Sequence, residues 1–452
     1  MKLFGFLVKR YNSIRADKHF GEIFSGSIMV FIAKILAAVI SLGASVIVAQ
    51  YYGAEVVGVL ALINSFFAVV TVFTLLGTNT SVLRLIPEYT LKYSPGAAFG
   101  LFKKMLLLVI ISSGILTLVL LFGSEIIAER IFGNPELTIF FGLASLILVF
   151  KTLQKFSLQG LRAVQNIRAF ALIQLIGPLV NLLLLVVVTI VFFNKYTPVY
   201  IQLFIVVLMA SISLLVVNSN FKKKLTSKNV KAPVSFKGIL QISFPMFLTN
   251  SMAIFMGELT TLIAGHFLSE ADVGYYATAL RIAMLTTFVL QAINTVVAPK
   301  FAELFHQGLI DELFTIARKS TKLIFWSAVP LLLIFLFFGK WIIVFLYGLD
   351  FEVSYPLLLI LMGGLFVNAI SGSVGNFMNM CGYEKLFRNV MMISVLINIA
   401  LNILLIPRIG IYGAAITTSF TQIFWNVLLT AIIYRKYNQF FLYLPFIRFN
   451  RK

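Results

Sequence analysis

The chain has 452 residues, of which 60% are hydrophobic and 12% charged. Soluble domains are about 45–50% apolar and about 25% charged. So few charges cannot cover a water-facing surface of this length, which excludes a soluble enzyme, a disordered chain and a disulfide scaffold. The apolar residues form long unbroken runs, which also excludes a β-barrel built from short alternating strands.

The net charge is +20, from 36 lysines and arginines against 16 acidic residues. Such residues gather in the cytoplasmic loops of membrane proteins, so we assign this charge to membrane orientation and not to nucleic-acid binding. The single cysteine, Cys381, excludes an intrachain disulfide and a multi-cysteine metal site. The sequence has neither a G-x-x-x-x-G-K-[ST] phosphate loop nor an H-E-x-x-H motif, so we expect no cofactor and no metal.

The first predicted element, 1–24, mixes aromatic and basic residues and is expected to lie on the inner membrane surface. No small-residue cleavage site follows, so we expect no removable signal peptide. Apolar runs long enough to cross a bilayer then predict helices at 25–50, 56–77, 104–123, 137–154, 169–193 and 198–217. After a basic linker, 218–238, they predict six more at 239–268, 274–298, 321–338, 355–378, 388–406 and 411–434, before a basic tail at 435–452.

Basic residues predict how these helices are oriented. With the N-terminus inside, most lysines and arginines, among them Lys151 and Lys155, fall in inner segments. The outer loops hold only four basic residues, Arg130, Lys195, Lys340 and Arg408. A missed or extra helix would invert every later loop and remove this asymmetry. We therefore predict twelve spans, with both termini on the cytoplasmic side of a bacterial-type cell membrane.

An internal repeat supports a fold of two similar halves. Val57-Gly58 recurs as Val273-Gly274, an offset of 216 residues at which Arg84 also meets Lys300. Each half has six predicted spans, and an even number returns the chain to the same side, so the repeat is parallel. We predict an all-α multi-pass membrane protein in which two six-helix bundles, 25–217 and 239–434, surround a central cavity.

Four segments carry a family resemblance, and they occur at 51–58, 84–89, 265–276 and 407–415. In order and spacing they resemble the Wzx-type polysaccharide-biosynthesis flippases of the multidrug/oligosaccharidyl-lipid/polysaccharide (MOP) exporter superfamily. The resemblance implies a MATE-like fold and the translocation of undecaprenyl-diphosphate-linked oligosaccharide from the inner to the outer leaflet. The sugar would serve O-antigen, capsule or exopolysaccharide assembly. The implied partners are this substrate and membrane lipid, with a monovalent coupling ion and polysaccharide assembly proteins left open.

One position departs from the family pattern. Many relatives carry an acidic residue about five positions before the glycine that matches Gly265, where this chain has Thr260. The nearest acid, Glu258, would point in another direction from the helix. Whether Glu258 substitutes for that acid in ion coupling, or pairs with Arg281, is left open.

Three charged residues lie deep inside predicted spans, namely Lys34, Arg281 and Glu258, and all three belong to the predicted binding site. A charge at the bilayer centre costs about 3 kcal/mol on insertion scales, so such residues usually face a cavity or a partner. We expect Lys34 and Arg281 to hold a diphosphate in a water-filled cavity. Two alternatives stay open, namely that Arg281 pairs with Glu258 and that Lys34 extends toward the inner interface.

Polar residues complete the predicted binding site. We expect Asn250, Gln291 and Asn294 to meet sugar hydroxyls, although interhelical hydrogen bonds explain most amides in membrane helices. Arg84 and Lys300, related by the repeat, are expected to recruit the anionic headgroup at the inner mouth. The alternative for this pair is the ordinary excess of positive charge on the inner side.

Three other functions compete with the oligosaccharide flippase that the resemblance implies. A MATE-like ion-coupled exporter of small cations is disfavoured by a cationic cavity. A lipid II flippase shares the fold that the resemblance implies. A membrane polymerase or ligase would need room outside for an acid–base pair, and the predicted outer loops are short. We therefore expect a transporter and not an enzyme.

Overall fold

The structure is a computed structural model that describes residues 18–223, 235–443 and 445, with side chains from residue 29 onward except that of Thr249. Residues 1–17 of the predicted segment 1–24, and much of the linker 218–238 and the tail 435–452, lie outside these residues, whereas 18–24 form the start of the first helix. In the first half the helices are α2 (Lys18–Leu75), α3 (Thr78–Lys92), α4 (Pro95–Phe122), α5 (Ser124–Ile126), the π-helix η1 (Ile127–Ile131), α6 (Leu137–Ala163), α7 (Ile167–Val191) and α8 (Thr197–Lys223).

The second half, after the linker, is also helical throughout its described regular structure. Its helices are α9 (Phe236–Phe267), α10 (Glu270–Met284), α11 (Thr287–His306), α12 (Ile310–Tyr347), the 3₁₀ turn η2 (Leu349–Val353), α13 (Ser354–Ser371), α14 (Val374–Met380), α15 (Glu384–Ile409) and α16 (Ile411–Tyr437). The prediction of an all-α multi-pass membrane protein is confirmed.

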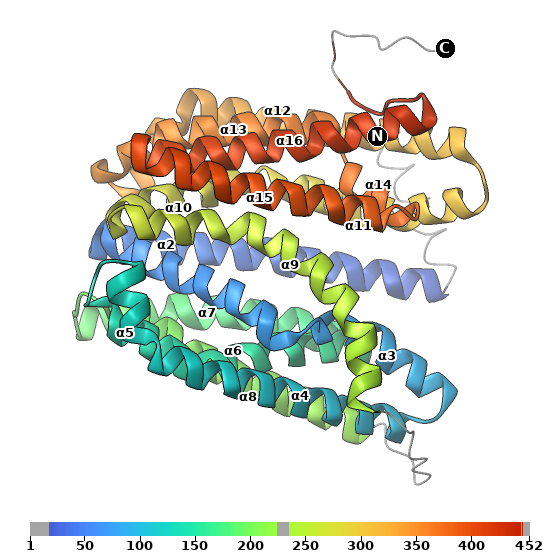
Figure 1. Cartoon of the computed structure of the whole chain (residues 1–452), viewed down its shortest axis with the longest axis horizontal. Coiled ribbons are helices and arrows are strands. Elements are labelled where there is room, and N and C mark those ends of the chain that lie inside the picture. Colours follow the sequence, from blue (N-terminus) through green and yellow to red (C-terminus); the bar gives the residue numbers. More distant parts are fainter. Residues whose placement is uncertain (1–17, 224–234, 444, 446–452) are drawn as a thin grey trace, which may run out of the picture.

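The described residues contain 10 helices long and apolar enough to cross a membrane, or up to 11 if the bent α9 counts as one span. The predicted number of twelve therefore stays a prediction. Part of the difference lies in α2, which merges the predicted spans 25–50 and 56–77 across a non-helical Gly53 with φ 80°. Glycine tolerates this φ because it has no Cβ, and Figure 1 shows α2 doubling back on itself.

The predicted span 274–298 differs in the opposite way, because it is divided between α10 and α11. The backbone N–H groups of Leu285 and Thr286 donate to Ile282 and Ala283, each at 3.1 Å, in tight i→i+3 turns. Interrupted membrane helices commonly line the binding sites of transporters. This interruption follows Arg281 by only a few residues.

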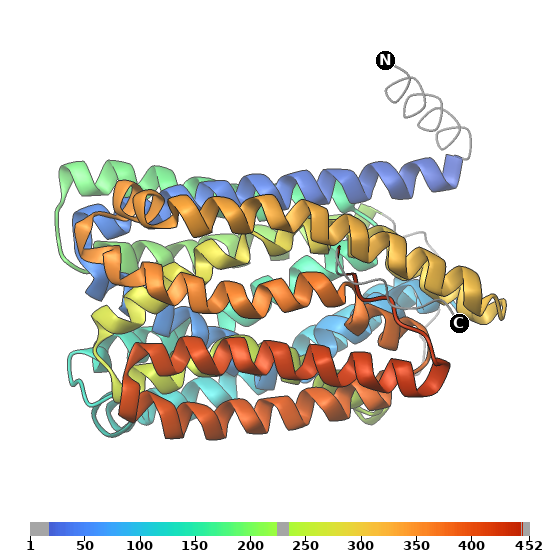
Figure 2. The ribbon, with the colours of Figure 1, turned by 90° about the horizontal axis from the view of Figure 1, so that it is seen from above.

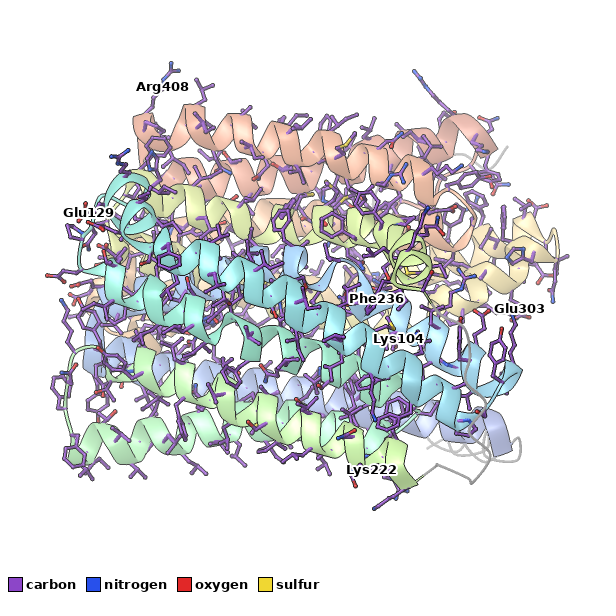
Figure 3. All side chains as sticks on the ribbon, turned by 60° about the horizontal axis from the view of Figure 1, so that its bottom comes forward. Lys104, Glu129, Lys222, Phe236, Glu303 and Arg408 are labelled. Carbon is purple, nitrogen blue, oxygen red and sulfur yellow. The ribbon has the colours of Figure 1, made fainter. Side chains whose placement is uncertain are left out.

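The long helices run side by side along the long axis of the molecule (Figure 2). Figure 1 shows α4, α6 and α8 on one side and α12, α13, α15 and α16 on the other, with part of α2, α9 and α10 between them. Labelled charged side chains such as Glu129, Arg408, Lys222 and Glu303 lie toward the two ends of the bundle in Figure 3. Large apolar side chains such as Ile190 and Phe337 are exposed on its flanks, as expected of a surface that faces lipid.

Buried apolar residues are organised differently at the two ends. At the end where α2 bends and α12 finishes, which is the predicted outer end, one continuous cluster joins the halves and includes Val56, Leu62, Tyr276 and Tyr347. At the predicted inner end the described residues form two clusters: one around Phe102, which joins the first half to Ile239 of α9, and one around Phe377 in the second half. The halves are thus packed together at the predicted outer end.

Candidate functional site

Two glycines allow the halves to touch at the predicted outer end. A Cβ added to Gly58 of α2 would lie 1.7 Å from the carbonyl oxygen of Glu270, and one added to Gly274 of α10 would lie 2.1 Å from that of Ala54. Real atoms do not approach so closely, so only glycine permits this backbone contact. Gly58 and Gly274 are the pair that the sequence repeat relates, which places the repeat at the junction of the halves.

Polar contacts surround this glycine crossing. The amide of Asn134 donates to the Glu270 carboxylate at 2.7 Å, and the amide of Gln50 donates to the Leu346 carbonyl at 2.8 Å. The hydroxyls of Ser45 and Tyr347 are 2.9 Å apart and buried. The glycine crossing and these three contacts, called the outer seal below, hold the predicted outer end closed.

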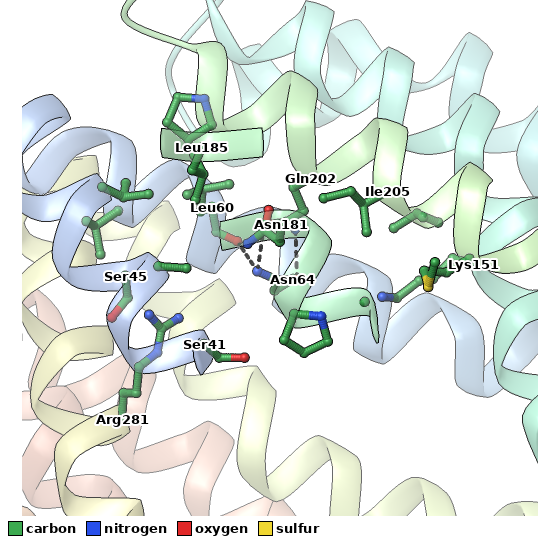
Figure 4. Close-up of a pocket in the computed structure, with 18 of the residues that line it drawn as sticks. Ser41, Ser45, Leu60, Asn64, Lys151, Asn181, Leu185, Gln202, Ile205 and Arg281 are labelled. Carbon is green, nitrogen blue, oxygen red and sulfur yellow. Dashed lines mark hydrogen bonds between the residues drawn. The ribbon is translucent and has the colours of Figure 1, made fainter. Parts of the chain in front are cut away.

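Cavity 1, of about 310 Å³, includes Ser45 of the outer seal in its lining. Figure 4 shows Ser45 and Lys151 on opposite sides of it. It is lined by α2, α6, α7 and α8 of the first half, and Arg281 is its one lining residue from the second half. Its cations are Lys151 and Arg281, and no carboxylate lines it. Its amide side chains are Asn64, Gln154, Asn181 and Gln202.

Lys151 and Lys155 were assigned to inner segments, and in the structure both line cavities within the bundle. Their side of the membrane stays a prediction. The predicted span ended at residue 154, whereas α6 continues to Ala163 and carries both lysines within it. The Lys155 ammonium donates to the Thr71 hydroxyl at 2.7 Å, and the Lys151 ammonium lies 5.9 Å from the centre of the Phe67 ring. These partners on α2 let α6 keep two charges inside the bundle.

Cavity 2, of about 340 Å³, extends toward the predicted inner end. Lys155 is its charged lining residue, and Asn79, Gln159, Gln174 and Asn250 surround it with amides. Asn250 was a predicted site residue, and it lines this cavity while donating to the Thr80 hydroxyl at 2.5 Å. The structure therefore brings Asn250 to a cation that the sequence analysis had placed elsewhere.

Cavity 4, of about 320 Å³, lies between α2, α9 and α10 and holds Arg281 together with Glu258. Ser65 donates to the Glu258 carboxylate at 2.8 Å. No ion pair within 4.0 Å joins Arg281 to Glu258 or to any other carboxylate of the described residues. Arg281 lines cavities 1 and 4 alike, so it lies where the two halves share space.

The other predicted substrate residues lie outside the three cavities. Lys34 is exposed and lines none of them. Gln291 is also exposed, and its amide donates to the Thr287 hydroxyl at 3.3 Å. Asn294 accepts a hydrogen bond from Ser373. A role for these three side chains in substrate binding stays a prediction.

The predicted recruitment pair forms exposed ion pairs on single helices. Arg84 lies 3.9 Å from Glu88, and Lys300 lies 2.6 Å from Glu303. Lys92 also donates to Glu88, and this hydrogen bond lowers the pKa of the Glu88 carboxyl. Exposed pairs of this kind are worth little to stability, and their role in recruitment stays a prediction.

Sequence reasoning missed most of the residues that line the cavities. The signal lay in α6, where Lys151, Lys155 and Gln159 recur every four residues and therefore share one helical face. A stripe of this kind inside an apolar helix indicates a water-filled or substrate-filled space. On α7 and α8, the isolated amides Asn181 and Gln202 gave no comparable pattern.

Comparisons with known proteins identify the family to which the chain belongs. Residues 54–356, more than half of the chain, match the family described as "Polysaccharide biosynthesis protein". A probable low-salt glycan biosynthesis flippase of Haloferax volcanii is 26% identical over 36% of this chain, an alignment that spans only 35% of that protein. An uncharacterized membrane protein of Methanocaldococcus jannaschii is 23% identical over 80% of this chain and 74% of its own length.

Solved structures share the fold at low sequence identity. An inward-facing MATE family multidrug resistance transporter of the MOP superfamily has a TM-score of 0.71 at 14% identity, covering 91% of this chain and 98% of its own. The lipid II flippase MurJ in an inward closed conformation has a TM-score of 0.70 at 19% identity, covering 90% and 87%. A MOP superfamily transporter from Pyrococcus furiosus has a TM-score of 0.63 at 17% identity, covering 92% and 95%. This chain belongs to the polysaccharide biosynthesis protein family and has the fold of the MOP superfamily of transporters.

Proposed function

We propose that this chain is a flippase that carries undecaprenyl-diphosphate-linked oligosaccharide from the inner to the outer leaflet of the cell membrane by alternating access. Both termini would then lie in the cytoplasm. The proposal is supported by the family, by the Haloferax volcanii relative named as a probable glycan biosynthesis flippase, and by the fold shared with the lipid II flippase MurJ.

The charge of the cavities carries the proposal. Across cavities 1, 2 and 4 the charged lining residues are Lys151, Lys155, Arg281 and Glu258, a net charge of +2. A diphosphate that joins a lipid to a sugar carries two negative charges, one for each phosphate. The lining therefore matches the headgroup in charge, and the headgroup can enter this part of the membrane without a counter-ion.

The side chains suit different parts of the transfer. Arg281 can bind phosphate oxygens through two parallel N–H bonds, and Lys151 offers a compact charge on the opposite wall of cavity 1. The lipid tail can stay in the bilayer while the headgroup occupies the cavity. Because the outer seal is closed, we propose that this conformation takes up substrate from the inner side, and that rocking of the two halves opens the outer side.

MATE-like export of small cations fits the cavities less well. A net positive lining repels the small cations that a MATE-like exporter would carry. Thr260 accepts a hydrogen bond from the Asn402 amide at 3.0 Å and donates to the Asn398 oxygen at 3.3 Å, so that position has neutral partners. We therefore propose no carboxylate-based ion coupling at Thr260.

The test uses the purified full chain in proteoliposomes with a fluorescent lipid-linked oligosaccharide. Wild-type protein is expected to move the labelled sugar between leaflets, and the double variant Lys151→Met/Arg281→Ala is expected to abolish that movement. Lys222→Met, a change at an exposed lysine near the end of α8, is the matched control and should keep it. Full transport by the double variant at equal insertion would contradict the proposed binding mode.

A further inference from the structure

Cavity 1 holds an amide cluster drawn from four helices: Asn64 on α2, Gln154 on α6, Asn181 on α7 and Gln202 on α8. We propose that this amide cluster is a subsite that binds the hydroxyl groups of the sugar next to the diphosphate and sets which sugar is accepted. The inference rests on the proposed function and deepens it, because it assigns the sugar to residues separate from the cations.

Half of the amide cluster is already paired. The Gln202 amide donates to the Asn64 oxygen at 2.8 Å, and the Asn64 amide donates back to Gln202 at 3.3 Å and to the Leu60 carbonyl at 2.8 Å. Figure 4 shows Asn64, Asn181 and Gln202 close together, between Leu60 and Lys151. These bonds hold Asn64 and Gln202 as a fixed polar wall beside Asn181.

The other half of the cluster is unpaired. Neither Asn181 nor Gln154 has a side-chain hydrogen bond within the described parts of the chain, although both are partly buried. Unpaired amides in a membrane interior are unfavourable unless something in the cavity bonds to them. An amide offers both a donor and an acceptor, as a sugar hydroxyl does, whereas a phosphate oxygen only accepts.

The other lining residues and the volume of cavity 1 limit which kind of sugar can bind. The amide cluster shares cavity 1 with Lys151 and Arg281, so a sugar bound to it can remain attached to phosphates held by those cations. A volume of about 310 Å³ lies at the lower end of the range of about 300–1,000 Å³ for ligand sites, which suits the first sugar better than a long chain. No aromatic ring and no carboxylate lines the cavity, so recognition depends on hydrogen bonds to a neutral sugar.

The experiment measures binding of two lipids to the purified full chain: polyprenyl diphosphate alone, and the same lipid bearing one neutral hexose. Wild-type protein is expected to bind the hexose-bearing lipid more tightly. Asn181→Ala and Gln154→Ala are each expected to reduce this preference about fivefold, the value of one hydrogen bond. Gln241→Ala, which changes an exposed amide outside the three cavities, is the matched control and should leave the preference unchanged.

The outcomes separate the two proposals. Failure of wild-type protein to bind either lipid would overturn the proposed function, whereas equal binding of both lipids would overturn only the sugar subsite. An unchanged preference in Asn181→Ala and Gln154→Ala would also overturn the subsite. So would loss of the preference in the single variant Gln291→Ala, because Gln291 lies outside cavity 1. The binding of bare polyprenyl diphosphate by each variant serves as the check that the variant is folded.

Discussion

The glycine crossing gives the sharpest structural prediction. In Gly58→Ala, the new Cβ would lie 1.7 Å from the Glu270 carbonyl oxygen, whereas ordinary contacts begin at 3.4 Å. The helices α2 and α10 would have to separate by roughly 1.7 Å, and overpacking of this kind costs about 1–3 kcal/mol. The cost falls only on conformations in which these helices touch, so Gly58→Ala should favour an open outer seal.

The size of the effect can be worked out from this cost. A difference of about 2 kcal/mol shifts a two-state equilibrium about thirtyfold. Ser45, buried within the outer seal, becomes a reporter when it is changed to cysteine. The native Cys381 is fully buried, and burial raises the pKa of its thiol to about 12, so background labelling by a maleimide should be slow.

The assay compares the labelling rate of Ser45→Cys with and without Gly58→Ala, using a membrane-impermeant maleimide added outside intact cells. Entry from the inner side through cavity 1, which Ser45 also lines, then does not contribute. We expect the rate to rise by at least tenfold. Gly43→Ala is the matched control, because a Cβ on Gly43 meets nothing within 4 Å, and it should leave the rate unchanged. Equal rates in the Gly58→Ala and Gly43→Ala proteins would refute the idea that this crossing closes the outer end.

Two further predictions concern Asn134 in the outer seal and the buried Cys381. Asn134→Ala removes a hydrogen bond of the outer seal worth about 1 kcal/mol, so the same Ser45→Cys assay should show about a fivefold rise, and no rise would mean that this contact is dispensable. The second prediction concerns pH: the folded state keeps the Cys381 thiol protonated to about pH 12, whereas an unfolded thiol ionises near about 8.5. The unfolded state therefore binds fewer protons above that pH, so stability should fall as pH rises, and Cys381→Ala should flatten this decline in thermal unfolding curves; an unchanged slope would contradict it.

The membrane fold could be predicted because its signal is local. About 20 apolar residues are needed to cross a bilayer, so each apolar run can be identified as a membrane helix from its own residues alone. The repeated pair Gly58 and Gly274 also carried real information, since these glycines meet at the junction of the halves. Arg281 could be assigned to a cavity because an arginine in an apolar span must have a polar environment.

The cavity residues could not be predicted because they depend on packing between distant segments. Lys155 donates a hydrogen bond to Thr71, which lies 84 positions away in sequence. Because the sequence does not show this partner, the lysine was assigned to the segment that follows the span 137–154. Gln291 and Asn294 were placed on one continuous helix, 274–298, with the residues before them. The structure interrupts that helix with i→i+3 turns at Leu285 and Thr286, and sequence periodicity does not reveal such a break.

The most direct test of the charge match compares transport of a diphosphate-linked sugar with that of the same sugar on a monophosphate lipid. With the cavity lining at +2, we expect wild-type protein to prefer the diphosphate. Lys155→Met lowers the lining by one charge and should shift the preference toward the monophosphate. An identical ratio of transport rates in the two proteins would contradict the account.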